Sequence, residues 1–415
     1  MKVLFIAPYV TINAIPMLTR CKCGFGYIVF EMAKGVSEKA EVDFVLRNYR
    51  YKAFNVDRVH FINNRFIDFL KNIRYCSSIK ILFHLWKTYR MSYKELIVLI
   101  YVWLQSGYYY KSIKDGNYDI VHIHGCGFFD EIYIDICRRC AIKFVITLHG
   151  LNSFSNAINV ERSVKEYERD ILRKVVKKEF PLTVISSGIK NTICNEYGIG
   201  NSDYISVVCN SFSFNENVDD IHCDLDIKIK YNLPQDCKVL LYVGNISRNK
   251  NQEQLIRAFD LMPNELCTKT YVLFCGRDIE GGYAIDGMIE QSRYKDHLIL
   301  CGNVDKEIMP SYFSQADAIV LLSKAEGFGL SLIEGMHFGL PCMTFADLDA
   351  YEDIYDECAV VGLKSRSDQE VADGVQRLLE TKWDKDKIIQ HSKKFERQSM
   401  IEKYIEVYKK IIYGR

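Results

Sequence analysis

The sequence predicts an α/β fold made of two domains, each a parallel sheet covered by helices. Three observations support this prediction. The chain of 415 residues exceeds the size at which a single hydrophobic core keeps growing. Its hydrophobic content of 48% supplies enough apolar side chains for two cores. Short apolar runs typical of buried strands alternate with amphipathic segments, and this alternation starts again near the middle of the chain.

The first domain is expected over residues 1–212. It opens with the apolar run KVLFIAPY, which predicts a strand because β-branched and aromatic residues fill it. The elements expected after it are a helix at 27–38, a strand at 41–46, a strand at 118–125, a helix at 130–140, and strands at 143–150, 182–187 and 204–211. Strands this uniformly apolar indicate a parallel sheet with both faces covered. The amphipathic C-terminal helix, about 396–415, is expected to complete this domain.

The second domain is expected over residues 213–395, with the polar stretch 210–224 as the linker. Its expected elements are a strand at 237–245, a helix at 251–262, strands at 270–278, 297–304 and 318–323, and helices beyond them. Ligands of open parallel sheets bind beyond the carboxyl ends of the strands. We therefore expect the strand-end loops of both domains to face a central cleft.

Residues 51–114 do not follow the strand–helix rhythm. From Arg50 to Lys114 there are 12 Lys and Arg against 3 Asp and Glu, with Trp86, Trp103 and many Tyr and Phe between them. Basic, aromatic amphipathic helices are typical of surfaces that lie on anionic lipid headgroups. The same pattern fits a helical insertion packed on the first sheet with its charges solvated, because amphipathicity shows only that one helix face is buried. Both interpretations remain open.

Charge and cysteine content exclude several protein classes. The net charge of +1 gives no reason to expect a nucleic-acid partner. The N-terminus MKVLFIAPYV lacks the pattern of a signal peptide, so the 15 cysteines are expected to be reduced thiols in a cytoplasmic enzyme. The pairs Cys21/Cys23 and Cys137/Cys140 have no second pair at zinc spacing, which favours small buried side chains. The longest apolar run, 96–104, is about half the ~18 residues that a membrane span requires.

The segment AEGFGLSLIEGMHFGLP, residues 325–341, carries the strongest functional signal. An apolar strand ends at Ser323, and a helical pattern begins near Gly329. The N-terminus of such a helix directs unpaired N–H groups and a positive dipole end at its surroundings, which suits a phosphate. Glu334, one to two turns into the helix, suits sugar hydroxyls, and Glu326 precedes the helix on the turn. By periodicity alone, both carboxylates could equally be solvated surface groups.

Together with the preceding ADAIVLLS, this string resembles the signature of glycosyltransferase family 4, which comprises retaining enzymes of the GT-B fold. The E-x7-E motif of that family matches Glu326 and Glu334. The resemblance implies that Glu326 contacts hydroxyls of the donor sugar and Glu334 contacts the ribose. It also implies that backbone amides of the intervening loop, at Phe328, Gly329 and Leu330, hold the phosphates.

The resemblance extends to other loops of the second domain. LYVGNISRNKNQEQLIRAF looks like the family segment in which a basic pair grips the diphosphate, and Lys250 matches its lysine. Asn245 stands where many members have Arg, so Arg248 is expected to supply the second cation. Such a pair would stabilise the charge that develops on the leaving diphosphate. FCGRD and LCGNV resemble the base-binding strands, which implies that Gly276, Arg277, Asn303 and Val304 surround the nucleobase.

In the first domain, RCKCGFGYIVFEMA resembles a glycine-rich loop and helix that face the donor diphosphate, with Gly24 and Gly26 in the matching places. YDIVHIHGCG and FVITLHGLN resemble paired strands that carry histidines. His149 matches a histidine near the reacting sugar, His124 is an acceptor-side candidate, and His122 is expected to serve packing. A three-histidine metal site is the alternative, and paired strand histidines more commonly serve packing and hydrogen bonding.

The resemblance implies a retaining glycosyltransferase that moves a sugar from a nucleotide-diphosphate donor to a hydroxyl acceptor. We expect a glycan or lipid-linked acceptor in surface polysaccharide or glycolipid synthesis. No cofactor is expected, since no D-x-D sequence occurs in a suitable loop and the fixed cations would replace magnesium. Glu352 matches an acidic residue of a later family loop. The protein is expected in the cytoplasm, with possible contact to the membrane surface through residues 51–114. The alternatives are a glycan phosphorylase, a non-catalytic partner of the same fold, and a nucleotide-sugar epimerase, which would not need the E-x7-E turn.

Overall fold

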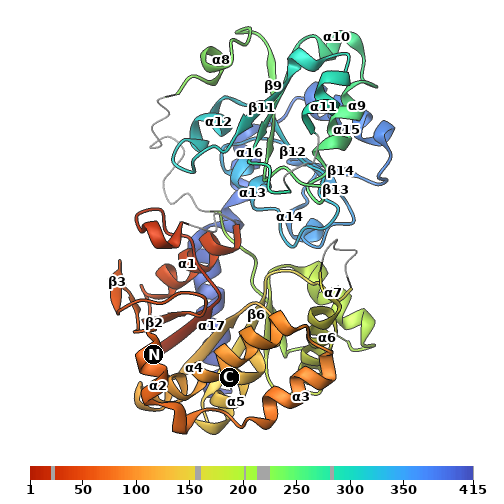
Figure 1. Cartoon of the computed structure of the whole chain (residues 1–415). Helices are drawn as coiled ribbons and strands as arrows, with labels where there is room; N and C mark the ends of the chain where they lie inside the picture. The colour runs from red at the N-terminus through yellow and green to blue at the C-terminus, as the bar shows by residue number, and fades with distance from the viewer. Residues whose placement is uncertain (20–23, 155–159, 201, 213–224, 281–284, 415) are drawn as a thin grey trace. The chain divides into compact units, whose positions relative to one another are not determined.

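The computed structural model describes the whole chain except residues 20–23, 155–159, 201, 213–224, 281–284 and 415. The chain divides into two compact units. The N-terminal unit comprises Met1–Ser155, Asn159–Asn210 and Arg397–Arg415, and the C-terminal unit comprises Ser211–Glu396. Each unit is an α/β sheet with helices on its faces (Figure 1), which confirms the predicted fold class. Most of the expected linker lies outside the described residues.

The N-terminal unit contains an eight-stranded sheet in the order β3-β4-β2-β1-β5-β6-β7-β8. Its strands are β1 Lys2–Ala7, β2 Glu41–Leu46, β3 Phe54–Val56, β4 Val59–Phe61, β5 Ile120–His124, β6 Lys143–Leu148, β7 Leu182–Val184 and β8 Ile205–Val207. Every neighbouring pair is parallel except β3 and β4. The long strands are buried along almost their whole length because helices cover both faces.

The helices of this unit are α1 Gly24–Val36, α2 Phe66–Lys71, α3 Lys80–Tyr89, α4 Tyr93–Asp115, α5 Asp130–Arg139, α6 Arg162–Val176, α7 Ser187–Glu196 and α17 Arg397–Tyr413. The C-terminal helix α17 packs into this unit (Figure 1), where Met400, Tyr404 and Tyr408 join the core formed with β1, β2 and α1. A capping box starts α4, because Ser92 accepts from the amide of Glu95 and the Glu95 carboxylate accepts from the amide of Ser92.

Residues 51–114 differ in part from the helical insertion that the sequence suggests. Residues 54–61 form the hairpin β3–β4, and β4 extends the sheet by pairing with β2. The helices α2, α3 and α4 follow from Phe66 onward. The hairpin strands have only three residues each, too few for period-two alternation to distinguish them from a loop.

The C-terminal unit contains a fully parallel sheet of six strands in the order β11-β10-β9-β12-β13-β14. Its strands are β9 Lys238–Val243, β10 Thr270–Cys275, β11 Leu298–Gly302, β12 Ala318–Leu321, β13 Cys342–Phe345 and β14 Val360–Leu363. The helices are α8 Ile227–Lys230, α9 Gln252–Phe259, α10 Asn264–Cys267, α11 Ile285–Gln291, α12 Met309–Gln315, α13 Leu330–His337, α14 Tyr351–Ile354, α15 Asp368–Glu380 and α16 Lys385–Ser392. Strand order reverses between β9 and β12, and ligands of such sheets bind beyond the strand ends at this switch point.

Candidate active site

The loops after β9 and β12 lie side by side at the switch point of the C-terminal sheet. Asn249 joins them: its carbonyl accepts from the amide of Lys324 at 2.7 Å, and its side-chain amide donates to the carbonyl of Ala325 at 2.9 Å. The amide of Ala325 donates back to Asn249 Oδ1 at 3.2 Å. Three hydrogen bonds therefore fix the first loop against the turn that begins the E-x7-E segment.

Lys250 and Glu326 form an ion pair in this place, with Lys250 Nζ donating to Glu326 Oε2. Ser323 Oγ donates to the same carboxylate oxygen at 3.3 Å. The two charged side chains are 24% and 19% exposed, so solvent reaches both but does not surround them. Two residues assigned to the donor from separate sequence segments, 76 positions apart, are thus brought into direct contact.

A buried tyrosine positions the backbone of both loops. Tyr242, in β9, donates its hydroxyl proton to the carbonyl of Lys250 and accepts from the amide of Leu322 at 2.8 Å. Gly276 directly follows β10 and contacts the start of the loop after β9, where a Cβ on Gly276 would come within 2.0 Å of the carbonyl oxygen of Gly244. Only glycine lets these strand ends approach so closely.

Gly329 is the N-cap residue of helix α13, and its φ of +85° places it in the left-handed region that favours glycine. No side chain caps its first turn, and the amide of Leu332 donates to the Gly329 carbonyl at 3.0 Å. Phe328 is 3% exposed and packs against Phe395. The start of this helix therefore offers backbone donors and a positive dipole end, as an anion site requires. Glu334 lies partly buried within α13.

The other residues assigned to the donor follow the neighbouring strands β9, β10 and β11. The amide of Ile246, next to Asn245, donates to the carbonyl of Arg277 at 2.9 Å, and the amide of Gly276 donates to the carbonyl of Gly302 at 2.8 Å. These bonds place the three loops next to one another. The side chains of Arg277 and Asn303 are exposed, and Val304 is partly exposed.

Arg248 is exposed, and its backbone amide donates to Glu280 Oε1 at 3.2 Å. Lys250 therefore has a carboxylate partner in the E-x7-E turn, Glu326. Among the described residues, the Arg248 guanidinium forms no ion pair. Whether Arg248 supplies a second cation to the donor stays a prediction.

Sequence reasoning missed Asp349, which lies in the loop between β13 and α14. Burial, and after it the neighbouring carboxylates of Glu326 and Asp347, together raise the pKa of its carboxyl to about 6. Arg366 binds Asp347 through two hydrogen bonds, of 2.9 and 2.8 Å. Glu352, the acid that the resemblance selects in this loop, is exposed on α14. Because Asp349 is partly buried and interacts with Glu326, we assign Asp349, and not Glu352, to the candidate site.

In the N-terminal unit, His124 ends β5 and His149 directly follows β6. Their rings meet, with 3.1 Å between His124 Nδ1 and His149 Nε2. Burial lowers the pKa of His149 to about 3 and that of His124 well below its usual range, so both rings are neutral at physiological pH. The remaining ring nitrogens, His124 Nε2 and His149 Nδ1, are buried and have no hydrogen-bond partner among the described residues.

His122 has a different environment from the two strand-end histidines. It is fully buried in the core, and its ring nitrogens lie 2.6 Å from the hydroxyl oxygens of Tyr408 and Thr147. These two contacts use both nitrogens, so the ring has no free position for a metal ion. Within the described residues no cluster of three or more metal-ligating side chains occurs, and Cys21 and Cys23 lie outside them.

The glycines expected in a loop of the first domain belong to a helix instead. Helix α1 begins at Gly24, three residues before its expected start, so Gly24 and Gly26 lie in its first turn. Gly26 packs against Thr11, where a Cβ would come within 2.3 Å of the hydroxyl oxygen. Between them, Phe25 places its ring edge on His149, with 4.8 Å between ring centroids. The start of α1 therefore lies next to the histidine pair.

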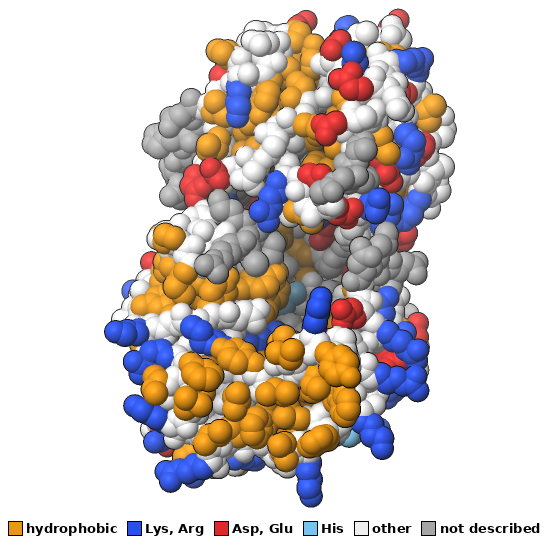
Figure 2. Space-filling view, viewed as in Figure 1, with side chains coloured by type: hydrophobic (Ala, Val, Ile, Leu, Met, Phe, Trp, Pro, Cys, Tyr) orange, Lys and Arg blue, Asp and Glu red, His pale blue; other side chains and the backbone are white. Residues whose placement is uncertain are grey.

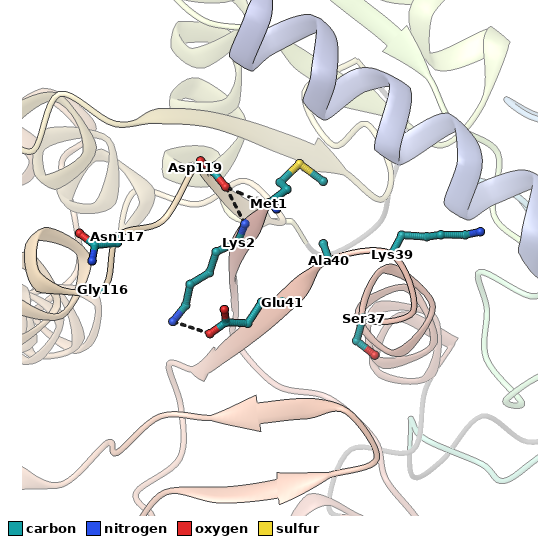
Figure 3. Close-up of a pocket in the computed structure, with 9 residues that line it drawn as sticks. All are labelled: Met1, Lys2, Ser37, Lys39, Ala40, Glu41, Gly116, Asn117 and Asp119. Atoms are coloured by element: carbon teal, nitrogen blue, oxygen red, sulfur yellow. Dashed lines mark hydrogen bonds and ion pairs between the residues drawn. The ribbon is translucent and has the colours of Figure 1, made fainter.

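A hollow of about 670 Å³ lies at the opposite edge of the N-terminal sheet, at the amino ends of β1 and β2 (Figure 3). Its charged groups pair with each other: the amide of Lys2 donates to Asp119 at 2.7 Å, and Lys2 Nζ lies 2.7 Å from Glu41. Ligands of parallel sheets bind at the carboxyl ends of the strands. This hollow is therefore not the candidate site.

Comparison with known proteins identifies the family. Residues 24–213 match the model of Glycosyltransferase Family 4, and residues 225–395 match that of Glycosyl transferases group 1. The chain is similar to N-acetyl-alpha-D-glucosaminyl L-malate synthase of Bacillus anthracis, with 24% identity over 55% of this chain and 56% of that enzyme. It is also 22% identical to the O-antigen biosynthesis glycosyltransferase WclY of Escherichia coli, over 59% of this chain and 66% of that protein.

A crystal structure of a glycosyltransferase from Rickettsia africae has the same fold, with a TM-score of 0.68, 18% identity and coverage of 100% of this chain and 99% of that one. The match to the Bacillus enzyme spans little more than half of that enzyme's length. The two family models together match most of both units, including the loops that hold Lys250, Glu326 and His149. The chain belongs to the group 1, family 4 glycosyltransferases and has the GT-B fold.

Proposed function

We propose that this protein transfers a glycosyl residue from a nucleotide-diphosphate sugar to a hydroxyl group of a glycan or lipid-linked acceptor, with retention of anomeric configuration. The donor occupies the switch point of the C-terminal sheet. Lys250 and the amides of Phe328, Gly329 and Leu330 hold the diphosphate. Glu326 orients the sugar, and Glu334 binds the ribose.

The observation that carries this proposal is the contact between Lys250 and Glu326 beside the start of α13. Breaking the bond between sugar and diphosphate develops negative charge on the leaving oxygen, and a fixed cation and helix dipole stabilise that charge. In this proposal, Glu326, paired with Lys250, lies next to the bond between the sugar and the diphosphate. It accepts hydrogen bonds from sugar hydroxyls, which an apolar or basic side chain cannot do.

Asp349 extends the acidic side of the donor site. Because its raised pKa reflects burial beside Glu326, its carboxyl holds a proton more readily than an ordinary aspartate. With a pKa of about 6 the carboxyl is still mostly ionised at neutral pH, where it accepts hydrogen bonds from hydroxyl groups. We propose that Asp349 contacts a hydroxyl of the donor sugar together with Glu326.

The acceptor side is assigned to the N-terminal unit. His149 and His124 lie at the carboxyl ends of β6 and β5, and Phe25 in the first turn of α1 contacts His149. Gly24 and Gly26 of that turn remain assigned to the donor diphosphate. A neutral imidazole with an unpartnered buried nitrogen is suited to accept or donate a hydrogen bond to a sugar hydroxyl. The similarity to an O-antigen biosynthesis glycosyltransferase supports an acceptor that belongs to surface polysaccharide or glycolipid synthesis.

The test compares the wild type with Glu326→Ala and with Glu357→Ala as a matched control. Glu357 is an exposed carboxylate of the same unit. A thermal-shift screen against UDP-, GDP- and ADP-sugars first identifies the donor, because a ligand of the folded state raises its stability by mass action. Transfer to an acceptor extract is then followed with the radiolabelled donor.

We expect Glu326→Ala to abolish transfer and to retain binding of the free nucleotide, and Glu357→Ala to behave as wild type. Wild-type turnover by Glu326→Ala would refute the role of Glu326. Failure of every nucleotide sugar to raise the melting temperature would refute the donor site. Release of sugar phosphate that depends on added phosphate would identify a phosphorylase instead.

A further inference from the structure

Helices α2, α3 and α4 carry an unusual density of exposed apolar side chains. Eleven of the eighteen large hydrophobic residues that are exposed in the described chain fall within residues 66–100. They include Phe66 at 51%, Phe83 at 62%, Tyr93 at 83% and Ile97 at 67% exposure. Figure 2 shows hydrophobic side chains gathered over these three helices on one face of the N-terminal unit. We call the exposed apolar side chains of residues 66–100 the apolar face.

A folded core holds this face in place. The inner sides of α3 and α4 already pack into the core through Leu82, Leu85, Leu99 and Val102. The exposed apolar residues on the outer sides are therefore not needed for that packing. Two hydrogen bonds of 2.6 Å, from Tyr89 to Asp170 and from Ser163 to Glu95, tie the end of α3 and the start of α4 to α6. The apolar face is therefore a fixed surface of the unit. Contiguous apolar surface of this kind marks an interaction site.

Exposed lysines and arginines lie among the residues of the apolar face, and no acidic side chain of the described chain forms an ion pair with them. Within residues 66–100, six exposed cations make no ion pair with any described residue: Lys71, Arg74, Lys80, Lys87, Arg90 and Lys94. The two acids of the segment are both occupied: Asp68 binds Arg65 at 2.8 and 2.9 Å, and Glu95 accepts from Ser92 and Ser163. Figure 2 shows Lys and Arg side chains around the hydrophobic area.

A shallow pocket of about 440 Å³ lies on the last turns of α3. Phe83, Trp86 and Met91 line it together with Lys87 and Arg90. Apolar walls with two adjacent cations suit a phosphate headgroup whose acyl chain lies against the aromatic rings. An indole 42% exposed at such a boundary is also typical of membrane interfaces.

The charges decide between possible occupants of this surface. In a symmetric dimer the same patch faces its own copy, so unpaired cations would be brought together and repel. An anionic bilayer instead offers hydrocarbon for the apolar side chains and phosphates for the lysines. Among the helices that the structure describes, none is both long and apolar enough to cross a bilayer. We propose that the apolar face and its six cations dock the protein on the surface of a membrane rich in anionic phospholipid.

The test is co-sedimentation of the full chain with vesicles of phosphatidylcholine alone and with an equal mixture of phosphatidylcholine and phosphatidylglycerol. One variant carries Lys80→Gln, Lys87→Gln and Lys94→Gln. Its control carries Lys269→Gln, Lys364→Gln and Lys382→Gln, which remove three exposed lysines of the C-terminal unit and change the net charge equally. A third variant carries Phe83→Ser and Ile97→Ser. Circular dichroism and melting curves establish that each variant folds, which exposed positions should permit.

We expect the wild type to bind the mixed vesicles, and to bind them less tightly as salt is added. Loss of three lysines should lower the partition coefficient about 100-fold, because each cation near an anionic surface contributes about 1 kcal/mol. The apolar variant should lose binding as well, and the lysine control should keep it. Absence of binding at low salt, or equal losses in the lysine variant and its control, would overturn the proposal. So would concentration-dependent dimerisation without vesicles that Phe83→Ser and Ile97→Ser abolish, which would assign the face to a second copy of the chain. None of these readouts uses catalytic activity.

Discussion

Replacing Asp349 by asparagine should stabilise the C-terminal unit at neutral pH. The Asp349 carboxyl is partly buried and faces the carboxylates of Glu326 and Asp347, and these surroundings raise its pKa from 3.8 to about 6. At neutral pH the folded protein must nevertheless hold it ionised. Asparagine has nearly the same shape without the charge, so the substitution removes the unfavourable burial and the repulsion together.

The magnitude follows from proton linkage. Above a pH of about 6, Asp349 is ionised in both the folded and the unfolded state, and below 3.8 it is protonated in both. Between these values the folded state binds more protons, so the free energy of unfolding falls as the pH rises. A difference of about two pH units corresponds to about 3 kcal/mol at most. Since the side chain is partly exposed, we expect Asp349→Asn to gain about 1–3 kcal/mol at neutral pH and little below the unfolded pKa.

The assay must report on the C-terminal unit alone. Two of the three tryptophans, Trp86 and Trp103, lie in the N-terminal unit, and Trp383 lies in the C-terminal unit, where its indole donates to the carbonyl of Leu378 at 2.8 Å. In a background with Trp86→Phe and Trp103→Phe, urea unfolding followed by tryptophan emission measures the stability of the C-terminal unit. Equal stability of Asp349→Asn and the parent at neutral pH, or a loss on substitution, would refute the reasoning.

Three further predictions concern the remaining parts of the candidate site. Lys250→Met should weaken binding of the nucleoside diphosphate about 10- to 100-fold by calorimetry, since a charge-assisted hydrogen bond contributes about 1.5–3 kcal/mol, and Lys382→Met should bind as wild type. Between pH 6.5 and about 3 only the unfolded state protonates His149, so this histidine makes the free energy of unfolding of the N-terminal unit fall as the pH falls. His149→Asn should reduce that fall by up to about 1.4 kcal/mol per pH unit. An unchanged pH dependence of stability in chemical denaturation would contradict this prediction. Gly276→Ala should destabilise the C-terminal unit by about 1–3 kcal/mol through the clash with Gly244. Gly287→Ala in α11, where the new Cβ meets no described atom outside its own helix within 4 Å, should be neutral or stabilising in the same thermal melt.

The sequence was sufficient for the fold class because the long strands of both sheets are parallel and buried. Strands such as β1 and β9 appear as continuous apolar runs, and their alternation with amphipathic helices leaves few other folds. The contact between Lys250 and Glu326 is also a consequence of this topology. Each follows one of the two strands that flank the switch point, so residues 76 positions apart must meet once the sheet forms.

Asp349 could not be recognised in this way. In the string ADLDAYED four acids stand within eight residues, and nothing in their spacing shows which of them folds inward. The structure buries Asp349 beside Glu326, engages Asp347 with Arg366 and leaves Glu352 exposed on α14. The choice depends on the turn between β13 and α14, and turn geometry is set by contacts with other segments as much as by local sequence.

The sequence also does not show which face of α4 is buried. Its run LIVLIYVWL is apolar on all sides, which by sequence alone predicts a helix buried in a core. In the folded unit Leu99 and Val102 are buried, whereas Ile97 and Ile100 are 67% and 40% exposed. A helix that is apolar on both faces but buried on only one exposes hydrocarbon to water, and this exposure costs free energy in proportion to its area. Such a surface is explained when a second apolar environment covers it, and the uncompensated lysines around it indicate that this environment is negatively charged.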